Sequence, residues 1–247
     1  MIKTGIIGTG YWGKILQDKL KLVSNLKFTQ NSKNYNPECF TEVDWIFIAT
    51  PPNTHYHIAK DCIGKNVNVF IEKPFCSNLI QAEELQRLAK DNNLLLYVDN
   101  VFLSRSEISH LRVKDKIYSI NFLWYKDGPF HDTLVNDLLY HDLYILIKLY
   151  KFANVTNINI IQNEKNKLML SFIYDNIKIS IDYDRSGLLE QKKIIVINEQ
   201  TIFFDNKNQD PLLSLIKKCL VKKIDFDSNL TLNLQTTKLI ESIKASL

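Results

Sequence analysis

The chain of 247 residues suits one large domain or two small ones. With 45% hydrophobic and 23% charged residues it has an ordinary globular composition, and its net charge of +4 is too small to indicate a nucleic-acid partner. No apolar run approaches the roughly 20 residues of a membrane span, and no apolar leader precedes the first strand, so no membrane partner is expected. The four cysteines show no CxxC spacing and no histidine cluster, which favours free thiols in the cytoplasm and no metal site.

The first hundred residues alternate between short apolar strands and amphipathic helices, which indicates a parallel sheet covered by helices. Strands are expected at residues 2–7, 26–30, 44–50, 67–71 and 94–98. Helices are expected at residues 13–23, 53–63 and from the N-cap Ser77 to about residue 90, with Ile80 facing inward. Between the second and third strands, residues 36–40 have room only for a loop or a single turn.

The pattern changes after about residue 104, where strands follow one another and several alternate apolar with polar residues. Strands are expected at residues 117–125, 155–161, 168–174, 177–183 and 194–204, and helices at 134–149, 212–221 and 230–247. Asp210 and Pro211 read as the N-cap and first residue of the second of these helices. The predicted fold class is α/β: residues 1–103 form a parallel-sheet domain, and residues 104–247 form an α+β domain with an open-faced, mostly antiparallel sheet.

A glycine-rich loop, Gly8-Thr9-Gly10-Tyr11-Trp12-Gly13, directly follows the first strand and opens the first helix. In a GxGxxG loop the first glycine permits the tight turn, the second lets a pyrophosphate approach the backbone, and the third lets helix and strand pack closely. The helix N-terminus offers N–H groups and a positive dipole to phosphates. The loop therefore predicts a Rossmann domain in which Gly8, Gly10, Tyr11, Trp12 and Gly13 bind a dinucleotide.

The end of the second strand bears on the choice between NAD and NADP. An acid is typical there when the site holds the ribose hydroxyls of NAD. This chain has Asn31, Ser32 and Lys33 instead. Ser32 and Lys33 could hold a 2′-phosphate, so the sequence leans slightly to NADP, with NAD still open.

Three further motifs carry a family resemblance: residues 49–55 (Ala-Thr-Pro-Pro-Asn-Thr-His), residues 72–75 (Glu-Lys-Pro-Phe), and Asp137 with His141 four positions later. Together with the glycine loop, this set resembles the glucose–fructose oxidoreductase and inositol dehydrogenase family, Gfo/Idh/MocA. The resemblance implies an NAD(P)-dependent oxidoreductase that moves a hydride between the cofactor and a carbinol or ketone. It also implies a sugar or nucleotide-linked sugar as the substrate.

The resemblance assigns Lys73, Asp137 and His141 as the catalytic residues. It also places Thr50, Pro51, Asn53, His55, Glu72 and Lys73 near the dinucleotide. These residue types suit the chemistry, because a hydride leaves a carbinol carbon only as the hydroxyl proton leaves too. A histidine can accept that proton near neutral pH, and a lysine can stabilise the developing negative charge.

Two positions depart from the family pattern: Leu139 stands where a glycine is common, and Tyr144 where an acid is common. The chain is also short for the family. These departures leave open a cofactor-binding regulator or pseudoenzyme of the same fold, and a nucleotide-binding module with a non-redox ligand. The open sheet face predicts a homo-oligomer, a dimer or tetramer.

Overall fold

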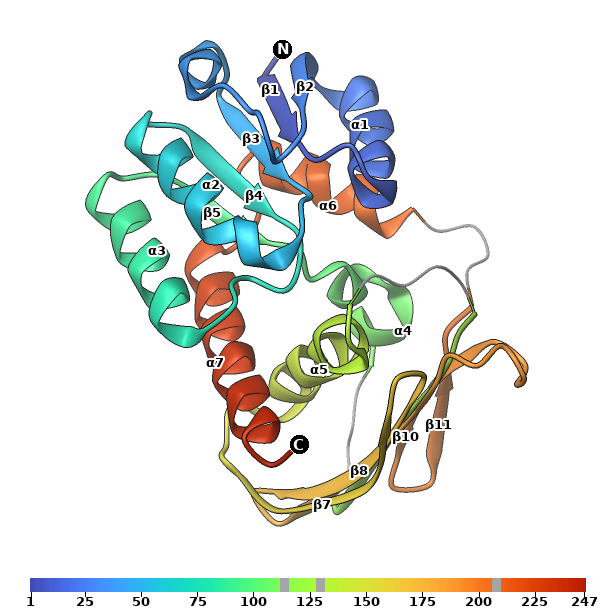
Figure 1. The fold of residues 1–247 in the computed structure, drawn as a ribbon. Coiled ribbons are helices and arrows are strands. Elements are labelled where there is room, and N and C mark those ends of the chain that lie inside the picture. The colour runs from blue at the N-terminus through green and yellow to red at the C-terminus, as the bar shows by residue number, and fades with distance from the viewer. Residues whose placement is uncertain (112–115, 128–131, 206–209) are drawn as a thin grey trace. The chain divides into compact units, whose positions relative to one another are not determined.

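The computed structural model describes residues 1–111, 116–127, 132–205 and 210–247 (Figure 1). The chain forms two compact units. The first comprises Met1–Val101 together with Asp210–Thr237, and the second comprises Phe102–Gln209 together with Lys238–Leu247. The fold class predicted from the sequence is confirmed: a parallel five-stranded sheet in the first unit and a mixed six-stranded sheet in the second.

The first unit is built on a parallel sheet with the strand order β2-β1-β3-β4-β5. Its strands are β1 (Lys3–Ile7), β2 (Asn25–Gln30), β3 (Trp45–Ile48), β4 (Asn68–Ile71) and β5 (Leu96–Val98). Because β1 lies between β2 and β3, the strand order reverses beside β1. In open α/β sheets, ligands bind outside the carboxyl ends of the strands at such a reversal.

Helices pack on both faces of this sheet (Figure 1). They are α1 (Tyr11–Val23), α2 (Pro52–Gly64), α3 (Leu79–Asp91), α6 (Pro211–Leu220) and the first part of α7 (Phe226–Lys244). A 3₁₀-helix (Pro37–Glu42) supplies the single turn expected before β3. The N-cap of α3 is Asn78, whose Oδ1 accepts from the Gln81 N–H, and not Ser77 as expected. Ile80, expected to face inward, is 78% exposed, because it lies two residues before Ala82 and so off the buried stripe of Ala82, Leu85 and Ala89.

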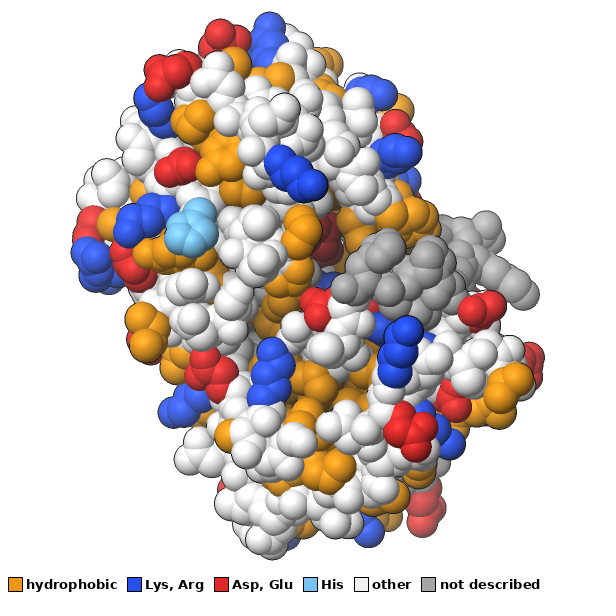
Figure 2. Space-filling model, viewed as in Figure 1, with side chains coloured by type: hydrophobic (Ala, Val, Ile, Leu, Met, Phe, Trp, Pro, Cys, Tyr) orange, Lys and Arg blue, Asp and Glu red, His pale blue; other side chains and the backbone are white. Residues whose placement is uncertain are grey.

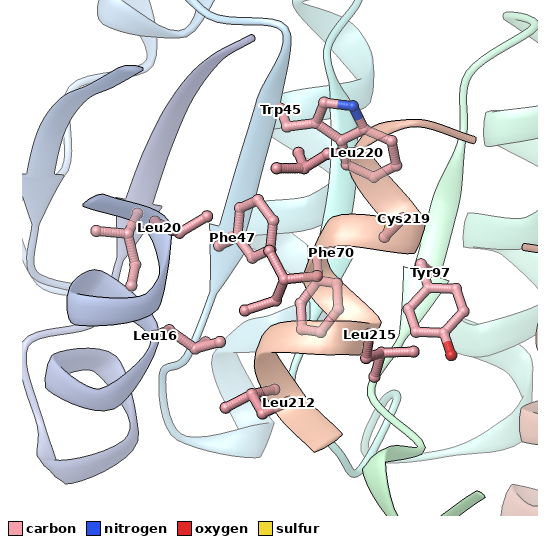
Figure 3. Packing of buried hydrophobic residues seen from close by; sticks show 12 residues of the cluster. Leu16, Leu20, Trp45, Phe47, Phe70, Tyr97, Leu212, Leu215, Cys219 and Leu220 are labelled. Atoms are coloured by element: carbon pink, nitrogen blue, oxygen red, sulfur yellow. The ribbon is translucent and has the colours of Figure 1, made fainter. Parts of the chain in front are cut away.

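Helix α6 returns from the far end of the sequence to cover this first sheet (Figure 3). Its buried residues Leu215 and Cys219 belong to one apolar cluster with Phe47, Phe70 and Tyr97 of the strands. Each such side chain contributes roughly 1.5–3 kcal/mol when fully buried. The predicted domain boundary at residue 103 stays a prediction. That boundary assigned α6 to the second domain, whereas in the structure α6 packs with the first unit. The physical reason is that the apolar stripe of α6 fits the sheet face beside α1.

At the free edge of β5, a side chain of α7 makes hydrogen bonds to the backbone of Val98. The Asn229 Oδ1 accepts from the Val98 N–H at 2.9 Å, and the Asn229 Nδ2 donates to the Val98 carbonyl at 3.0 Å. One amide thus replaces the two hydrogen bonds that a neighbouring strand would make. Asn233 extends the contact to Asn100, so α7 is fixed to the end of the sheet by buried polar bonds.

The second unit contains a six-stranded sheet with the order β11-β10-β6-β9-β8-β7. Its strands are β6 (Ser119–Tyr125), β7 (Val155–Glu164), β8 (Lys167–Tyr174), β9 (Ile177–Asp184), β10 (Lys192–Ile197) and β11 (Gln200–Phe203). All neighbours are antiparallel except β6 and β9. The strand expected at residues 194–204 is instead a hairpin, because Asn198 adopts a left-handed φ of 53° and reverses the chain.

One face of this sheet is buried and the other is partly exposed. Along β8, Leu170 and Phe172 are buried, whereas Ser171 and Ile173 are only partly so. The buried face packs against α5 (Tyr140–Tyr150), which a π-helical turn (Val135–Leu139) precedes. The unit also holds a one-turn helix, α4 (Ser106–Ser109). The alternating burial along the strands therefore leaves one face of this sheet open, as the sequence predicted for this unit.

No helix of the described residues is long and apolar enough to cross a membrane. Charged side chains of both signs are interspersed over the face that Figure 2 shows. The described residues also hold no group of three histidine, cysteine or acidic side chains that could bind a metal ion.

Candidate functional site at the carboxyl edge of the first sheet

The glycine loop has the backbone geometry that its motif requires at two positions. Gly8 has a φ of +129°, and a Cβ added there would lie 2.1 Å from the Ala49 carbonyl oxygen. A Cβ at Gly13 would lie 2.1 Å from the carbonyl oxygen of Gly8. Neither position accepts a side chain without a backbone shift, because the loop packs against the end of β3 and against its own helix.

Gly10 has a different reason to lack a side chain. A Cβ there would meet no atom within 4 Å, so the polypeptide itself does not demand a glycine. Gly10 is the N-cap of α1, makes no side-chain cap, and is followed by the exposed rings of Tyr11 and Trp12. The space over Gly10 and the start of α1 is thus open to an anionic group, as a bound pyrophosphate requires.

The loop after β2 is organised by Asn31. Its Oδ1 accepts from the Lys33 N–H at 2.9 Å and from the Asn34 N–H at 3.2 Å, which makes an Asx turn. Asn31 therefore shapes the loop, while Lys33 is exposed and Ser32 is half-buried. The carbonyl of Gln30, just before the turn, accepts from the Gly8 N–H at 2.8 Å and ties this loop to the glycine loop.

His55 joins the loops that follow β3 and β4. Its Nδ1 lies 2.8 Å from the Pro74 carbonyl oxygen, and its Nε2 lies 2.9 Å from that of Thr50. The ring is completely buried, and burial lowers the pKa of the imidazole. A contact from this ring to a dinucleotide would have to replace one of these bonds. Within the loop, the Thr54 hydroxyl donates to Thr50, whereas Pro51 and Asn53 are exposed.

Lys73 lies beside two buried carboxyl groups at the same edge of the sheet. Glu72 comes directly after β4, and Asp99 directly after the neighbouring β5. The Glu72 N–H donates to the Ile48 carbonyl at 2.9 Å, which continues the strand ladder. Glu72 is 7% exposed and Asp99 is 3% exposed, whereas Lys73 is half-buried. The ammonium of Lys73 favours the ionised form of both acids.

Burial raises the pKa of both acids. It raises the pKa of Glu72, and the charge of Asp99 raises it further. Burial also raises the pKa of Asp99, to about 7, against the opposing influence of Lys73. Perturbed carboxyl groups beside a lysine, at the edge where open α/β sheets bind ligands, are typical of functional sites.

The other two residues of the predicted catalytic set lie in the second unit. Asp137 is in the π-helical turn, and its Oδ2 accepts from the guanidinium of Arg185, whose side chain is 2% exposed. His141 is in the first turn of α5 and is 7% exposed. Its Nδ1 lies 2.9 Å from the Tyr144 hydroxyl, which also accepts from the Phe102 N–H at 3.3 Å.

Comparison with known proteins shows which family the first unit resembles. Residues 23–100 match the model of the Gfo/Idh/MocA oxidoreductases, described as having an NAD-binding Rossmann fold. This part of the chain is similar to the Gfo/Idh/MocA family. The matched stretch contains β3, β4 and the loops that carry Thr50 and Lys73.

Individual Gfo/Idh/MocA relatives extend the likeness to the whole chain. UDP-N-acetylglucosamine 3-dehydrogenase of Acidithiobacillus ferrooxidans is 25% identical over 169 residues, which are 60% of this chain and 54% of that protein. The chain thus aligns with about half the length of this relative. A solved structure of that enzyme covers all of this chain and 97% of its own, with a TM-score of 0.85 at 17% identity. The WlbA dehydrogenase from Thermus thermophilus, solved with NAD, has a TM-score of 0.82 at 12% identity over 99% of this chain and 95% of its own. At these identities the solved structures establish the fold.

The second unit also holds a buried charged pair near His141 that the Gfo/Idh/MocA motifs do not mark. Lys193 of β10 is buried, pairs with Asp142, and has its Nζ 3.7 Å from the centroid of the Trp124 ring. That ring lies 5.6 Å from the imidazole of His141. Period-two alternation along β10 could have placed Lys193 on the buried face, because Ile195 and Ile197 share it, but no spacing rule names its partner.

Proposed function

We propose that this chain is a nicotinamide-dependent oxidoreductase that transfers a hydride between the cofactor and a carbinol or ketone of a sugar or nucleotide-linked sugar. The observation that supports this most is the glycine loop at the reversal of strand order, with open space over Gly10 and Lys73 at the same edge. The name of the dehydrogenase that aligns with the chain makes UDP-N-acetylglucosamine the first substrate to test.

The residues fit a dinucleotide at the start of α1. Gly8 and Gly13 form the turn, Gly10 leaves room for the pyrophosphate, and the helix N-terminus offers its N–H groups. When bound, the nicotinamide ring accepts or supplies the hydride. NAD(H) is the first cofactor to test because the matching family model is NAD-binding. NADP(H) depends on Ser32 and Lys33 and has no further support.

In this proposal Lys73 stabilises negative charge on the reacting oxygen, and His141 exchanges the hydroxyl proton. The Tyr144 hydroxyl, which accepts from the Phe102 N–H, can donate its own hydrogen to Nδ1 of His141. That bond orients the imidazole and favours a proton on Nε2, the nitrogen left for substrate. Asp137 holds Arg185 and so acts as a positioning residue.

The first experiment is a fluorescence titration of the purified protein with NADH and, separately, NADPH. Trp12 is 45% exposed beside the site, so a bound dinucleotide should quench it. The matched control is Trp12→Phe, which should lose the quenching while calorimetry still detects binding. A folded protein that binds neither cofactor contradicts the proposal.

The second experiment separates turnover from binding. Lys73→Ala should lower kcat by about 10²–10³-fold, as does loss of one group that stabilises an oxyanion. Lys60→Ala removes an exposed lysine of α2 that pairs with Glu84, and should keep full activity. Equal activity of Lys73→Ala and the unmodified protein would contradict the role of Lys73.

A cofactor-binding regulator without turnover is the second candidate function. The ion pair between Asp137 and Arg185 favours it, because it engages one member of the predicted catalytic set. Tight dinucleotide binding with no turnover of any hydroxyl or keto sugar tested would support this candidate. If the cellular effect of the protein also survives Lys73→Ala, the enzyme proposal fails.

The proposed assembly is a homo-oligomer through the open face of the second sheet. Ile161 of β7 is 61% exposed, and Ile173 of β8 is partly exposed on the same sheet. Burying such a face is a common reason for self-association. Light scattering should give a dimer or tetramer at micromolar concentration, and a monomer would contradict this assembly.

A further inference from the structure

We propose that Glu72 and Asp99 act as one carboxylic acid–carboxylate pair that shares a single proton and so sets the net charge beside Lys73. The pair would be a positioning device for Lys73 and does not itself touch substrate. Only the rate measurement below rests on the proposed function, because the pair and its proton can be observed in a protein that turns nothing over.

The geometry of the sheet brings the two acids together. In the parallel pairing of β4 with β5, Ile71 lies opposite Val98, so the next residues on the two strands are Glu72 and Asp99. Both residues continue the ladder, since the Asp99 N–H donates to the Ile71 carbonyl at 2.8 Å. The ladder therefore fixes the backbone at both positions and places the two side chains next to each other on the same face.

The hydrogen bonding of the pair requires a proton. Glu72 Oε1 and Asp99 Oδ1 are buried and receive no hydrogen bond from an N–H or O–H group of the described residues. The two side chains hydrogen-bond each other. Two ionised carboxylates are acceptors only, so this bond exists only while one of them is protonated. Glu72 is the donor in this arrangement, and Asp99 accepts.

The groups around the pair explain why it keeps one proton and one charge. Lys73 faces both acids and favours ionisation, as do the backbone N–H groups of Lys73 at Glu72 and of Val101 at Asp99. The Tyr97 phenol also lies near Asp99 and is neutral, because burial and the charge of Asp99 both raise its pKa. His55 lies close enough to Lys73 to feel its charge, and burial lowers the pKa of His55, so it is neutral as well. One carboxylate is then matched by one ammonium.

Ionisation of Asp99 changes what Lys73 can do. While Asp99 is protonated, the pair is uncharged beside the ammonium. Once Asp99 ionises, Glu72 shares its proton with Asp99, and the pair carries −1 and offsets the positive charge that Lys73 presents to a substrate oxygen. The titration of Asp99 at a pKa of about 7 puts this change near neutral pH. Carbonyl reduction should therefore fall as the pH rises through this range.

Infrared spectroscopy of the whole protein tests the pair directly. The band of protonated carboxyl groups should shrink with a midpoint near pH 7 as Asp99 ionises, and the part that belongs to the shared proton on Glu72 should remain above this midpoint. Glu72→Gln removes the shared proton, so no band should remain above the midpoint. Asp99→Asn removes the charge that raises the pKa of Glu72, so the band of Glu72 should disappear at a lower pH than in wild type. The double variant should lose the band. Glu84→Gln, which removes a partly exposed acid of α3 paired with Lys60, is the control and should leave the band unchanged.

A band above the midpoint that is unchanged in both single variants would overturn the proposal, because the two acids would then not share that proton. So would a wild-type protein without a band above the midpoint. Circular dichroism establishes that each variant is folded, and the near-isosteric Asp99→Asn serves if Glu72→Gln fails to fold. The rate measurement follows kcat/KM for reduction against pH, which should decline through the infrared midpoint in wild type and lose this step in Asp99→Asn. If wild type shows no turnover, the proposed function fails while the infrared arm still decides the pair.

Discussion

Each unit of this molecule buries a charged cluster, and the two clusters have opposite designs. In the first unit, Glu72 and Asp99 bring two acids together, so their bond needs a proton. In the second unit, Asp142 meets Lys193 and also accepts from the Tyr183 hydroxyl at 2.6 Å. Opposite charges with full partners form a fixed structure, whereas like charges with a shared proton form a titrating one. Burial alone does not distinguish function from structure, but the signs of the buried charges do.

The largest predicted effect tests the structural cluster. Asp142→Ala leaves the Lys193 ammonium buried without its counter-charge, which should lower the free energy of unfolding by about 3–5 kcal/mol. Urea denaturation followed by circular dichroism measures it. The double variant Asp142→Ala/Lys193→Met removes both charges and should recover most of the loss. A loss below about 1 kcal/mol in the single variant would show that Lys193 is not a buried cation.

The next effect tests the titrating cluster. Burial raises the pKa of Asp99 to about 7, whereas an unfolded aspartate titrates near pH 3.9. Between about pH 4 and 7 the folded state therefore holds a proton that the unfolded state has released. The contribution of the pair to stability is complete below pH 4 and is lost as the pH rises toward 7, by up to about 1.4 kcal/mol per pH unit for one proton.

Thermal or urea unfolding across this range measures that slope. The double variant Glu72→Gln/Asp99→Asn should flatten it, while Glu84→Gln, which removes a partly exposed acid of α3, should leave this part of the profile in place. An unchanged slope in the double variant would assign the pH dependence to other groups.

The glycine loop gives a smaller effect that separates folding from binding. Gly13→Ala pushes a Cβ to 2.1 Å from the Gly8 carbonyl oxygen and should destabilise the first unit by about 1–3 kcal/mol. Gly10→Ala meets no atom, so the free energy of unfolding should change by less than about 0.5 kcal/mol. NADH binding should nevertheless weaken by about tenfold or more in Gly10→Ala, because the methyl group occupies the pyrophosphate space. Unchanged NADH binding in Gly10→Ala would place the cofactor elsewhere.

The two units also differ in how far the sequence predicts them. In the first unit, the glycine spacing and the alternation of strands and helices are local signals, so the loop, sheet and Lys73 follow from neighbouring residues. The place of α6 does not, because its apolar stripe shows only that one face is buried. Which sheet it covers depends on Phe47 and Phe70, more than a hundred residues earlier.

In the second unit, the sequence motif identified Asp137 and His141, but it did not identify the residues that contact them in the fold. Asp137 and His141 stand out by their spacing, yet Arg185 comes from β9 and the loop after it, and Lys193 from β10. Ion pairs between distant strands and helices leave no periodic trace in a sequence. The alternation along β10 marks Lys193 as inward-facing, but only the folded sheet sets it against Asp142 and the Trp124 ring.

The smallest predicted effect concerns the hydroxyl beside His141. Tyr144→Phe keeps the ring, which is fully buried, and removes the hydroxyl with its hydrogen bonds to Nδ1 of His141 and from the Phe102 N–H. A neutral hydrogen bond is worth about 0.5–1.5 kcal/mol, so kcat should fall by roughly threefold to tenfold with KM little changed. Steady-state kinetics measures this against Tyr118→Phe, a phenol that is 56% exposed in the same unit and should behave as wild type. A hundredfold loss in Tyr144→Phe would mean that the phenol takes part in proton transfer. No loss at all would mean that the imidazole is held by its ring contacts with Phe102 and Trp124, and that the hydroxyl does not set its tautomer.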